Sequence, residues 1–132
     1  MGDGTEPIED EELLYRRVQL VHVGPAEGGE PSPMAFHPGR HDRTGISVRR
    51  AKYVTPDQAA QNDRGKRYYI AVLRAGDLRR HGFQVVPRPV TGVAGHAELP
   101  NLTHENRHSD EAVEAKQLLA RKLCLKILGP LP

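Results

Sequence analysis

Residues 67–89, RYYIAVLRAGDLRRHGFQVVPRP, predict a strand, a short helix and a second strand in direct succession. The apolar and aromatic run at 68–73 suits a pleated surface, and Leu78 is the one large apolar residue of the helical turn that follows. Gly82 can adopt the left-handed conformation that ends a helix, and prolines end the second extended run at 83–86. We therefore expect this unit to form the centre of a β-sheet.

A second strong pattern covers residues 109–128 and predicts one long C-terminal helix. Ser109 is an N-cap candidate, acidic residues follow it in the first turn, and basic residues occupy the last turn. Gly129 and Pro130 end the pattern. The apolar stripe at helical spacing consists of Val113, Leu119, Ala120, Leu123 and Ile127. This stripe should cover one face of the sheet.

Further elements are expected around these two units. Alternating apolar residues predict strands within 13–23, 46–49 and 95–99, although a helix at 9–17 competes with the first of them. The segment Thr55-Pro56-Asp57-Gln58 is a capping box with proline at the first helical position, so a short helix should begin there. Residues 24–34 are rich in glycine and proline and predict a long loop.

Together these elements predict a single α+β domain. The expected architecture is a small mixed β-sheet of about four or five strands, with short connecting helices and one long C-terminal helix packed on a face. An acidic, disordered tail at residues 1–10 should precede the domain at residues 11–132. The length of 132 residues is common for one domain.

Cysteine usage and hydropathy indicate a cytoplasmic protein. The single cysteine, Cys124, lies in an apolar helical pattern and fits a reduced core thiol rather than a disulfide framework. No apolar run approaches the ~20 residues that span a bilayer. The first residues are acidic, the opposite of a signal or transit peptide. We expect no membrane contact.

Charge is distributed unevenly along the chain. Residues 1–12 carry acidic side chains and no base, whereas residues 37–88 are strongly basic. A basic middle suggests an anionic partner such as nucleic acid, a surface on which the acidic tail lies, or a solvated arginine-rich surface. The candidate anion-binding residues are Arg49, Arg50, Lys52, Lys66, Arg67, Arg79 and Arg80. No recognised nucleic-acid-binding motif accompanies them.

Several histidines are candidate ligands for a metal ion. Residues 104–108, HENRH, match the HExxH pattern of zinc peptidases, but the natural helix start is Ser109, after the motif, and no third ligand follows at a suitable position. We interpret these histidines as solvated loop residues. The loop at 37–42 could meet His96 and Glu98 and form a metal or acid–base site. The weak metal candidates are His37, His41 and His96, and neither a metal nor a cofactor is expected.

One order of residues has a parallel among known enzymes. An early strand carries Arg16, a second strand carries Ser47 with a helix straight after it, and a late strand carries Glu98. This order is similar to that of small ADP-ribosyltransferase-like or NAD-cleaving toxin domains. The resemblance implies that Arg16 holds a dinucleotide, Ser47 orients it, and Glu98 stabilises the developing oxocarbenium ion.

Three functions therefore follow from the sequence as hypotheses. The first is a small cytosolic accessory or interaction domain that works in complex with a larger protein, because no complete catalytic motif is present. The second is a toxin-type nucleotide-processing enzyme with Arg16, Ser47 and Glu98 as catalytic residues. The third is a nucleic-acid-binding protein that uses its basic surface.

Overall fold

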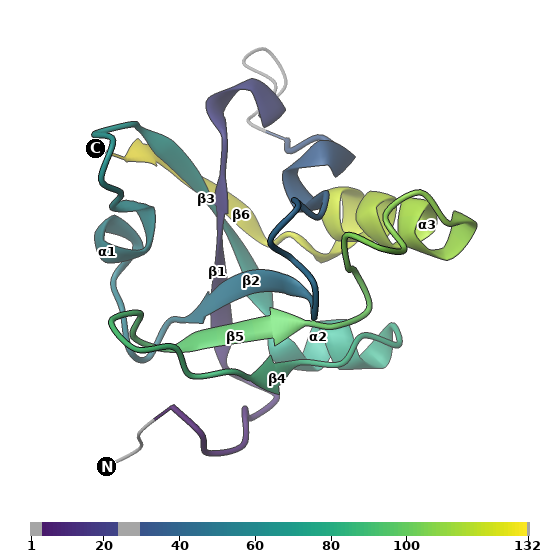
Figure 1. Cartoon of the computed structure of the whole chain (residues 1–132), viewed down its shortest axis with the longest axis horizontal. Helices are drawn as coiled ribbons and strands as arrows, with labels where there is room; N and C mark the ends of the chain where they lie inside the picture. Colours follow the sequence, from purple (N-terminus) through teal and green to yellow (C-terminus); the bar gives the residue numbers. More distant parts are fainter. Residues whose placement is uncertain (1–3, 24–29, 132) are drawn as a thin grey trace.

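The computed structural model describes residues 4–23 and 30–131, which form one six-stranded sheet (Figure 1). The strands lie in the order β4-β5-β2-β1-β3-β6, and every neighbouring pair is antiparallel. Their bounds are Leu13–Val18 (β1), Ile46–Arg50 (β2), Tyr68–Arg74 (β3), Val86–Pro87 (β4), His96–Leu99 (β5) and Lys126–Leu131 (β6).

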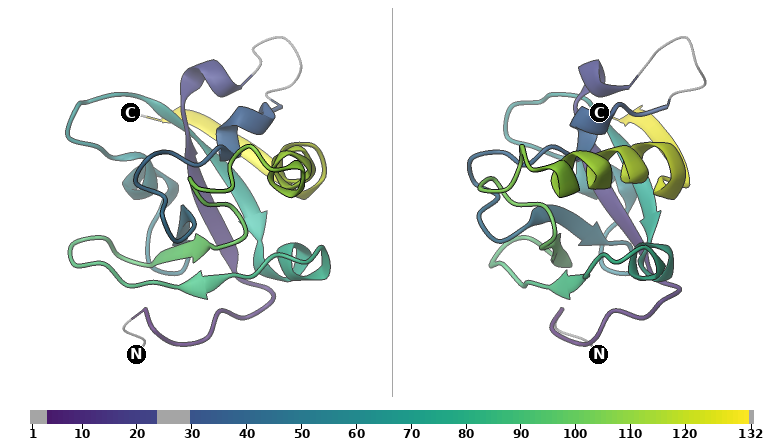
Figure 2. Two further views of the ribbon diagram at one scale, coloured as in Figure 1. Left: turned by 45° about the vertical axis from the view of Figure 1, so that its right-hand side comes forward. Right: turned by 90° about the vertical axis from the view of Figure 1, so that its right-hand side faces the viewer.

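Short helical segments connect and cover these strands. Their bounds are Leu20–His22 (η1), Pro33–Phe36 (η2), Pro56–Ala60 (α1), Ala75–Arg80 (α2), Asp110–Leu118 (α3) and Leu119–Leu123 (η3, a π-helical turn). α1 and α3 lie on opposite sides of the sheet (Figure 2). The sheet is therefore a central layer with helical cover on both faces.

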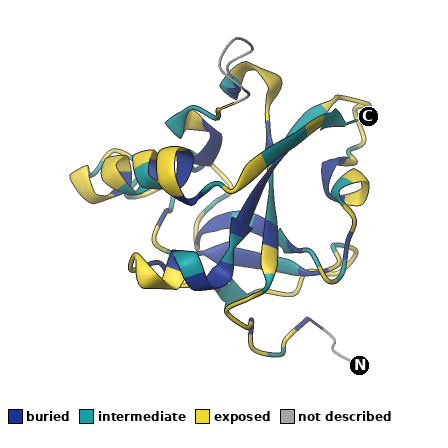
Figure 3. Cartoon of the chain, turned by 180° about the vertical axis from the view of Figure 1, so that it is seen from behind, coloured by how far each residue is buried: buried dark blue, intermediate teal, exposed yellow. Residues whose placement is uncertain are grey.

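Alternation along the strands separates two hydrophobic cores. Leu14, Val48 and Leu73 belong to the first core, which the residues of α3, η2 and η3 complete. Ile70 and Val72 point to the other face and pack with the residues of α1 in the second core. Successive strand residues serve opposite faces because the side-chain period of a strand is two. β3 is accordingly buried on both faces, whereas β1 and β2 bury one face and carry half-buried or exposed side chains on the other (Figure 3).

The predicted long C-terminal helix is wrong. α3 ends at Leu118, η3 adds one π-helical turn to Leu123, and the chain then turns into strand β6, which pairs with β3. Ile127 packs on the first core and Leu128 on the second, as the two faces of a strand require. The spacing of Leu123 and Ile127 fits a helix, but pairing with β3 overrides this local preference.

The predicted mixed sheet of about four or five strands is also wrong. All six strands of the described residues run antiparallel to their neighbours. The two strands of the 67–89 unit do not sit together at the centre, because β3 lies next to the β6 edge and the two-residue β4 forms the opposite edge. β1 separates them by pairing with both β2 and β3.

Several local predictions are confirmed. Thr55 and Gln58 form both hydrogen bonds of the capping box at the start of α1. The Ser109 hydroxyl accepts a hydrogen bond from the amide of Ala112 at the start of α3. Gly82 has a φ of +87° just after α2. Of the predicted loop at 24–34, residues 24–29 lie outside the described residues.

Candidate functional site

One face of β2 and β5 carries polar side chains next to the second core. Ser47 and Arg49 on β2 alternate with residues of the first core, and so do His96 and Glu98 on β5. Register pairs Ser47 with Glu98 and Arg49 with His96. Antiparallel pairing therefore brings four polar side chains from distant parts of the sequence onto one surface.

Ser47 and His96 form a hydrogen-bonded pair on this surface. The Ser47 Oγ lies 3.0 Å from His96 Nε2, and His96 Nδ1 lies 2.7 Å from the main-chain oxygen of Arg88. A carbonyl oxygen can only accept, so the ring proton of neutral His96 must be on Nδ1. Nε2 then carries the lone pair, and the Ser47 hydroxyl donates to it. This is the arrangement of a nucleophile, a base and a group that orients the base.

Arg88 is held by His96 at its main chain and by Glu98 at its side chain. Its amide donates to the main-chain oxygen of His96 at 3.0 Å. Its Nε lies 3.2 Å from Glu98 Oε1, which also accepts a 2.7 Å hydrogen bond from the Thr44 hydroxyl. Glu98 is only 8% exposed, so its carboxylate is fixed at the edge of the site. Glu98 therefore helps to hold Arg88, the residue after β4, in the position at which its carbonyl meets the His96 ring.

An open cleft of about 530 Å³ adjoins His96. Its lining residues are Gly4, Tyr53, Pro89, Val90, Gly92, Val93, Ala94, Gly95 and His96. Gly95 has a φ of +70°, and a Cβ there would lie 2.8 Å from Cβ of Tyr53. The turn before His96 can thus approach Tyr53 because residue 95 has no side chain. The cleft offers a mostly apolar volume next to the His96 imidazole, which in turn contacts the Ser47 hydroxyl.

The three residues named by the toxin-like resemblance do not share one face. Ser47 and Glu98 are cross-strand partners, but Arg16 pairs with Ala71 of the first core and points to the other side of the sheet. Its Nε donates to the main-chain oxygen of Ala35 at 3.2 Å and its Nη1 to that of Ser47 at 3.0 Å. Arg16 therefore binds the backbone of Ser47 from the opposite face of the sheet.

Four of the seven predicted anion-binding residues are paired with acids. Arg50 pairs with Glu6 and Glu12, Lys52 with Glu6, Arg79 with Asp10, and Arg80 with Asp77. The other three are Arg49, Lys66 and Arg67; Arg67 donates to the main-chain oxygen of Pro130 at 2.9 Å. Three of these four, Arg50, Lys52 and Arg79, therefore pair with acids of the N-terminal segment.

Arg50 is the centre of this neutralisation. Its side chain is 0% exposed, and its nitrogens lie 3.0 Å from both carboxylate oxygens of Glu12 and 3.3 Å from Glu6 Oε1. Main-chain oxygens of Gly4, Glu6 and Pro7 also accept from it. The hydroxyl of Tyr53, together with the Lys52 ammonium and the Arg50 charge, lowers the pKa of Glu6 to about 2.

The division into a disordered tail at 1–10 and a domain at 11–132 stays a prediction.

The metal candidates occupy three separate places. His96 belongs to the pair with Ser47, His41 is exposed in its loop, and His37 lies beside α3. The HENRH segment forms turns before α3 rather than a helix. Across residues 4–23 and 30–131, no three or more His, Cys, Asp or Glu side chains come close enough together to hold a metal ion.

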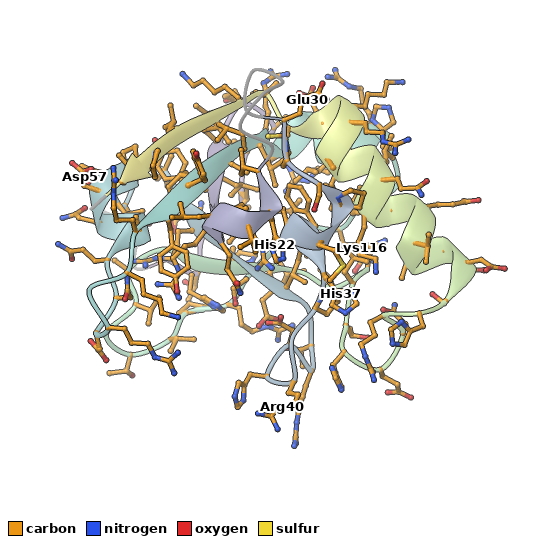
Figure 4. All side chains as sticks on the ribbon, turned by 90° about the horizontal axis from the view of Figure 1, so that it is seen from above. His22, Glu30, His37, Arg40, Asp57 and Lys116 are labelled. Atoms are coloured by element: carbon orange, nitrogen blue, oxygen red, sulfur yellow. The ribbon has the colours of Figure 1, made fainter. Side chains whose placement is uncertain are left out.

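A buried lysine next to His37 is a feature that the sequence did not indicate. Lys116 of α3 is 7% exposed, and its Nζ lies 2.9 Å from His37 Nδ1 and 3.0 Å from the main-chain oxygen of Arg107 (Figure 4). The rings of His37 and His108 are 5.9 Å apart. Burial lowers the pKa of Lys116, and burial together with the nearby Lys116 ammonium lowers the pKa of His37.

Acidification should therefore weaken the fold through His37. Its folded-state pKa lies below its ordinary value of 6.5, so the unfolded chain binds more protons between these two values. The free energy of unfolding should fall as pH drops from 6.5 toward the folded-state pKa. The charged groups that face His37 are Lys116 from α3 and Arg107, His104 and His108 from the preceding turns, and all of them oppose its protonation.

Urea unfolding at about pH 7.5 and about pH 5.5 tests this prediction, because the interval brackets the ordinary titration of histidine. The H37Q variant should lose less stability over the interval than the wild type. H41Q removes an exposed histidine and serves as the matched control. Equal losses in H37Q and the wild type would show that His37 is not the responsible group.

Comparisons with known proteins give no relative. A scan against protein-family models found no match, and searches of curated proteins and of solved structures found none either. Among the helices of the described residues, none has the length and apolar character needed to cross a membrane. The function must therefore be argued from the geometry of the site.

Proposed function

We propose that this protein is an ester hydrolase in which Ser47 is the nucleophile and His96 the general base. The observation that carries the proposal is the 3.0 Å contact between Ser47 Oγ and His96 Nε2, with Nδ1 committed to the Arg88 carbonyl. A serine hydroxyl is a weak nucleophile until a positioned base accepts its proton. A main-chain carbonyl supplies the orienting acceptor that a carboxylate supplies in the Ser-His-Asp arrangement.

The proposed reaction has two half-reactions. Ser47 Oγ attacks the ester carbonyl carbon while His96 Nε2 takes the hydroxyl proton, and the carbonyl π electrons move onto oxygen. The tetrahedral adduct then expels the alcohol, which takes the proton from Nε2 and leaves an acyl group on Ser47. Water attacks this acyl group with His96 again as base, releasing the carboxylic acid and restoring the serine hydroxyl.

The surroundings of the pair suit this chemistry. His96 lines the cleft of about 530 Å³, a volume typical of small-molecule sites. The side chains of Val90, Val93 and Pro89 can hold an aliphatic or aromatic group of the substrate in the part of the cleft that His96 lines. Glu98 and Thr44 stabilise the neighbouring strand edge, so the His96 ring is fixed before a substrate binds.

Covalent labelling tests the proposal directly. A fluorophosphonate probe reacts with serines that a base has activated, and mass spectrometry of the digested protein locates the adduct. We expect the adduct on Ser47. The other two serines of the chain are internal controls, because the hydroxyls of Ser32 and Ser109 accept hydrogen bonds from helical amides and, among the described residues, neither is hydrogen-bonded to a histidine. An absent adduct, or equal labelling of the three serines, would contradict the proposal.

The other hypotheses stay predictions. A toxin-type nucleotide enzyme requires Arg16, Ser47 and Glu98 around one pocket, and Arg16 lies on the opposite face of the sheet from the other two side chains. Nucleic-acid binding depends on basic residues of which several are paired with acids. Work as an accessory domain with a larger protein depends on a partner, and pull-down after nuclease treatment addresses it.

A further inference from the structure

Two arginines lie on the same sheet face as the Ser47–His96 pair. Arg49 is the cross-strand partner of His96 on one side and of Tyr15 on the other. Its Nε donates to the main-chain oxygen of Ala94 at 2.6 Å, which ties the guanidinium to the rim of the cleft. Arg17 follows Tyr15 by two residues on β1 and therefore points to the same face.

The two guanidinium groups are close enough to affect one another. Burial lowers the pKa of Arg49, and the positive charge of Arg17 lowers it further. Arg17 is held by a 3.0 Å hydrogen bond from Nη1 to the main-chain oxygen of Gln61, and its guanidinium carbon lies 4.7 Å from the centre of the Tyr68 ring. Main-chain oxygens thus hold the guanidinium groups of Arg17 and Arg49, and the Tyr68 ring lies against that of Arg17. These partners are neutral and leave the positive charges in place.

Several other arginines of the protein are ion-paired. Arg50, Arg79 and Arg88 each contact a carboxylate. Within the described part of the chain, neither Arg17 nor Arg49 has a carboxylate within ion-pair distance. Two positive charges on one sheet face without a counter-ion are unfavourable, and an anion bound at Arg49, beside His96 in the register, offsets them. A guanidinium also offers paired N–H donors that match the two oxygens of a carboxylate or phosphate.

We propose that Arg49, with the Arg17 charge on the same face, provides an oxyanion subsite that binds a carboxylate or phosphate group of the substrate. This inference rests on the proposed hydrolase function and names its substrate class: an ester whose acyl part ends in an oxyanion. Because Arg49 neighbours His96 in the register, an anion on Arg49 positions the attached ester beside Ser47. The apolar part of the substrate occupies the cleft.

A pair of chromogenic esters tests the substrate class. Mono-p-nitrophenyl glutarate carries a free carboxylate, and p-nitrophenyl butyrate is a neutral ester of similar size. After each rate is divided by that of alkaline hydrolysis, the wild type should prefer the glutarate in kcat/KM by roughly tenfold or more, since a hydrogen bond to a charged group contributes about that factor. The preference should fall toward one in R49Q. R67Q, which removes an arginine that donates to the main-chain oxygen of Pro130 and does not line the cleft, should keep the wild-type preference.

Binding without turnover separates this inference from the hydrolase itself. In the S47A background, NMR titration with inorganic phosphate and with acetate should shift resonances of β2 and β5, and R49Q should abolish the shifts. The stronger of the two anions identifies the group that the subsite prefers. Equal preference for the two esters, or unchanged shifts in R49Q, would overturn the subsite while labelling of Ser47 still supports the hydrolase. If Ser47 is not labelled, the hydrolase fails and the titration alone decides the subsite.

Discussion

Replacing Ser47 with alanine is expected to lower kcat/KM for p-nitrophenyl butyrate by about 10³-fold or more, because no nucleophile remains next to His96. Ser47 is half-buried on β2, and its hydroxyl oxygen makes a contact only with His96 in the described residues. The substitution removes one atom and should leave the free energy of unfolding nearly unchanged. A steady-state assay with matched urea unfolding curves separates loss of chemistry from loss of fold.

His96→Gln should reduce the same rate by about 10²-fold or more, because it removes the base that accepts the Ser47 proton. The double variant should be no slower than the slower single variant, since the two side chains act as one unit. S32A is the matched control: it removes a hydroxyl that caps η2 and should retain the wild-type rate. Turnover that survives both Ser47→Ala and His96→Gln would place the activity elsewhere.

Arg50→Met is expected to have the largest effect on stability, a loss of about 3–5 kcal/mol of unfolding free energy. The variant leaves the carboxylates of Glu6 and Glu12 without their buried partner, and it leaves the main-chain oxygens of the N-terminal segment without a donor. Unpaired buried polar groups carry their full desolvation cost. Urea unfolding at neutral pH measures the loss.

A matched variant separates burial from charge in this prediction. Arg79→Met also removes a bond between an arginine and an N-terminal acid, Asp10, but this pair is solvent-exposed. Exposed pairs contribute about 0–1 kcal/mol, so the R79M curve should nearly superpose on that of the wild type. Similar losses in R50M and R79M would show that the buried cluster around Arg50 contributes no more than a surface ion pair.

Local signals predicted local structure well. The capping box at Thr55 and the N-cap at Ser109 depend on residues three positions apart, and both form in the structure. β6 is different, because its strand state depends on pairing with β3, which lies far away in the sequence. A stripe that fits a helix through Leu123 and Ile127 gives no sign of that pairing. The sheet order was unpredictable for the same reason.

The candidate site was predictable in its parts and not in its assembly. Ser47, His96 and Glu98 stand out in the sequence as polar residues on short strands, and their shared face follows once β2 pairs with β5. Arg16 could reach the same pocket only if its side chain lay on the same sheet face as Ser47. Its pairing with Ala71 of β3 places it on the other face. Lys116 beside His37 could not be foreseen, because a lysine in an amphipathic helix is ordinarily solvated.

The group that orients His96 is encoded by no side chain. Any amino acid at position 88 supplies the same carbonyl oxygen, so substitutions there can weaken the Glu98 contact but cannot delete the acceptor itself. A Ser-His-Asp enzyme can lose its third member through one codon change, whereas this pair loses it only through a shift of the backbone. The arrangement would therefore tolerate substitutions at position 88. A sequence motif built from side chains would contain Ser47 and His96 but would miss the main-chain carbonyl of residue 88.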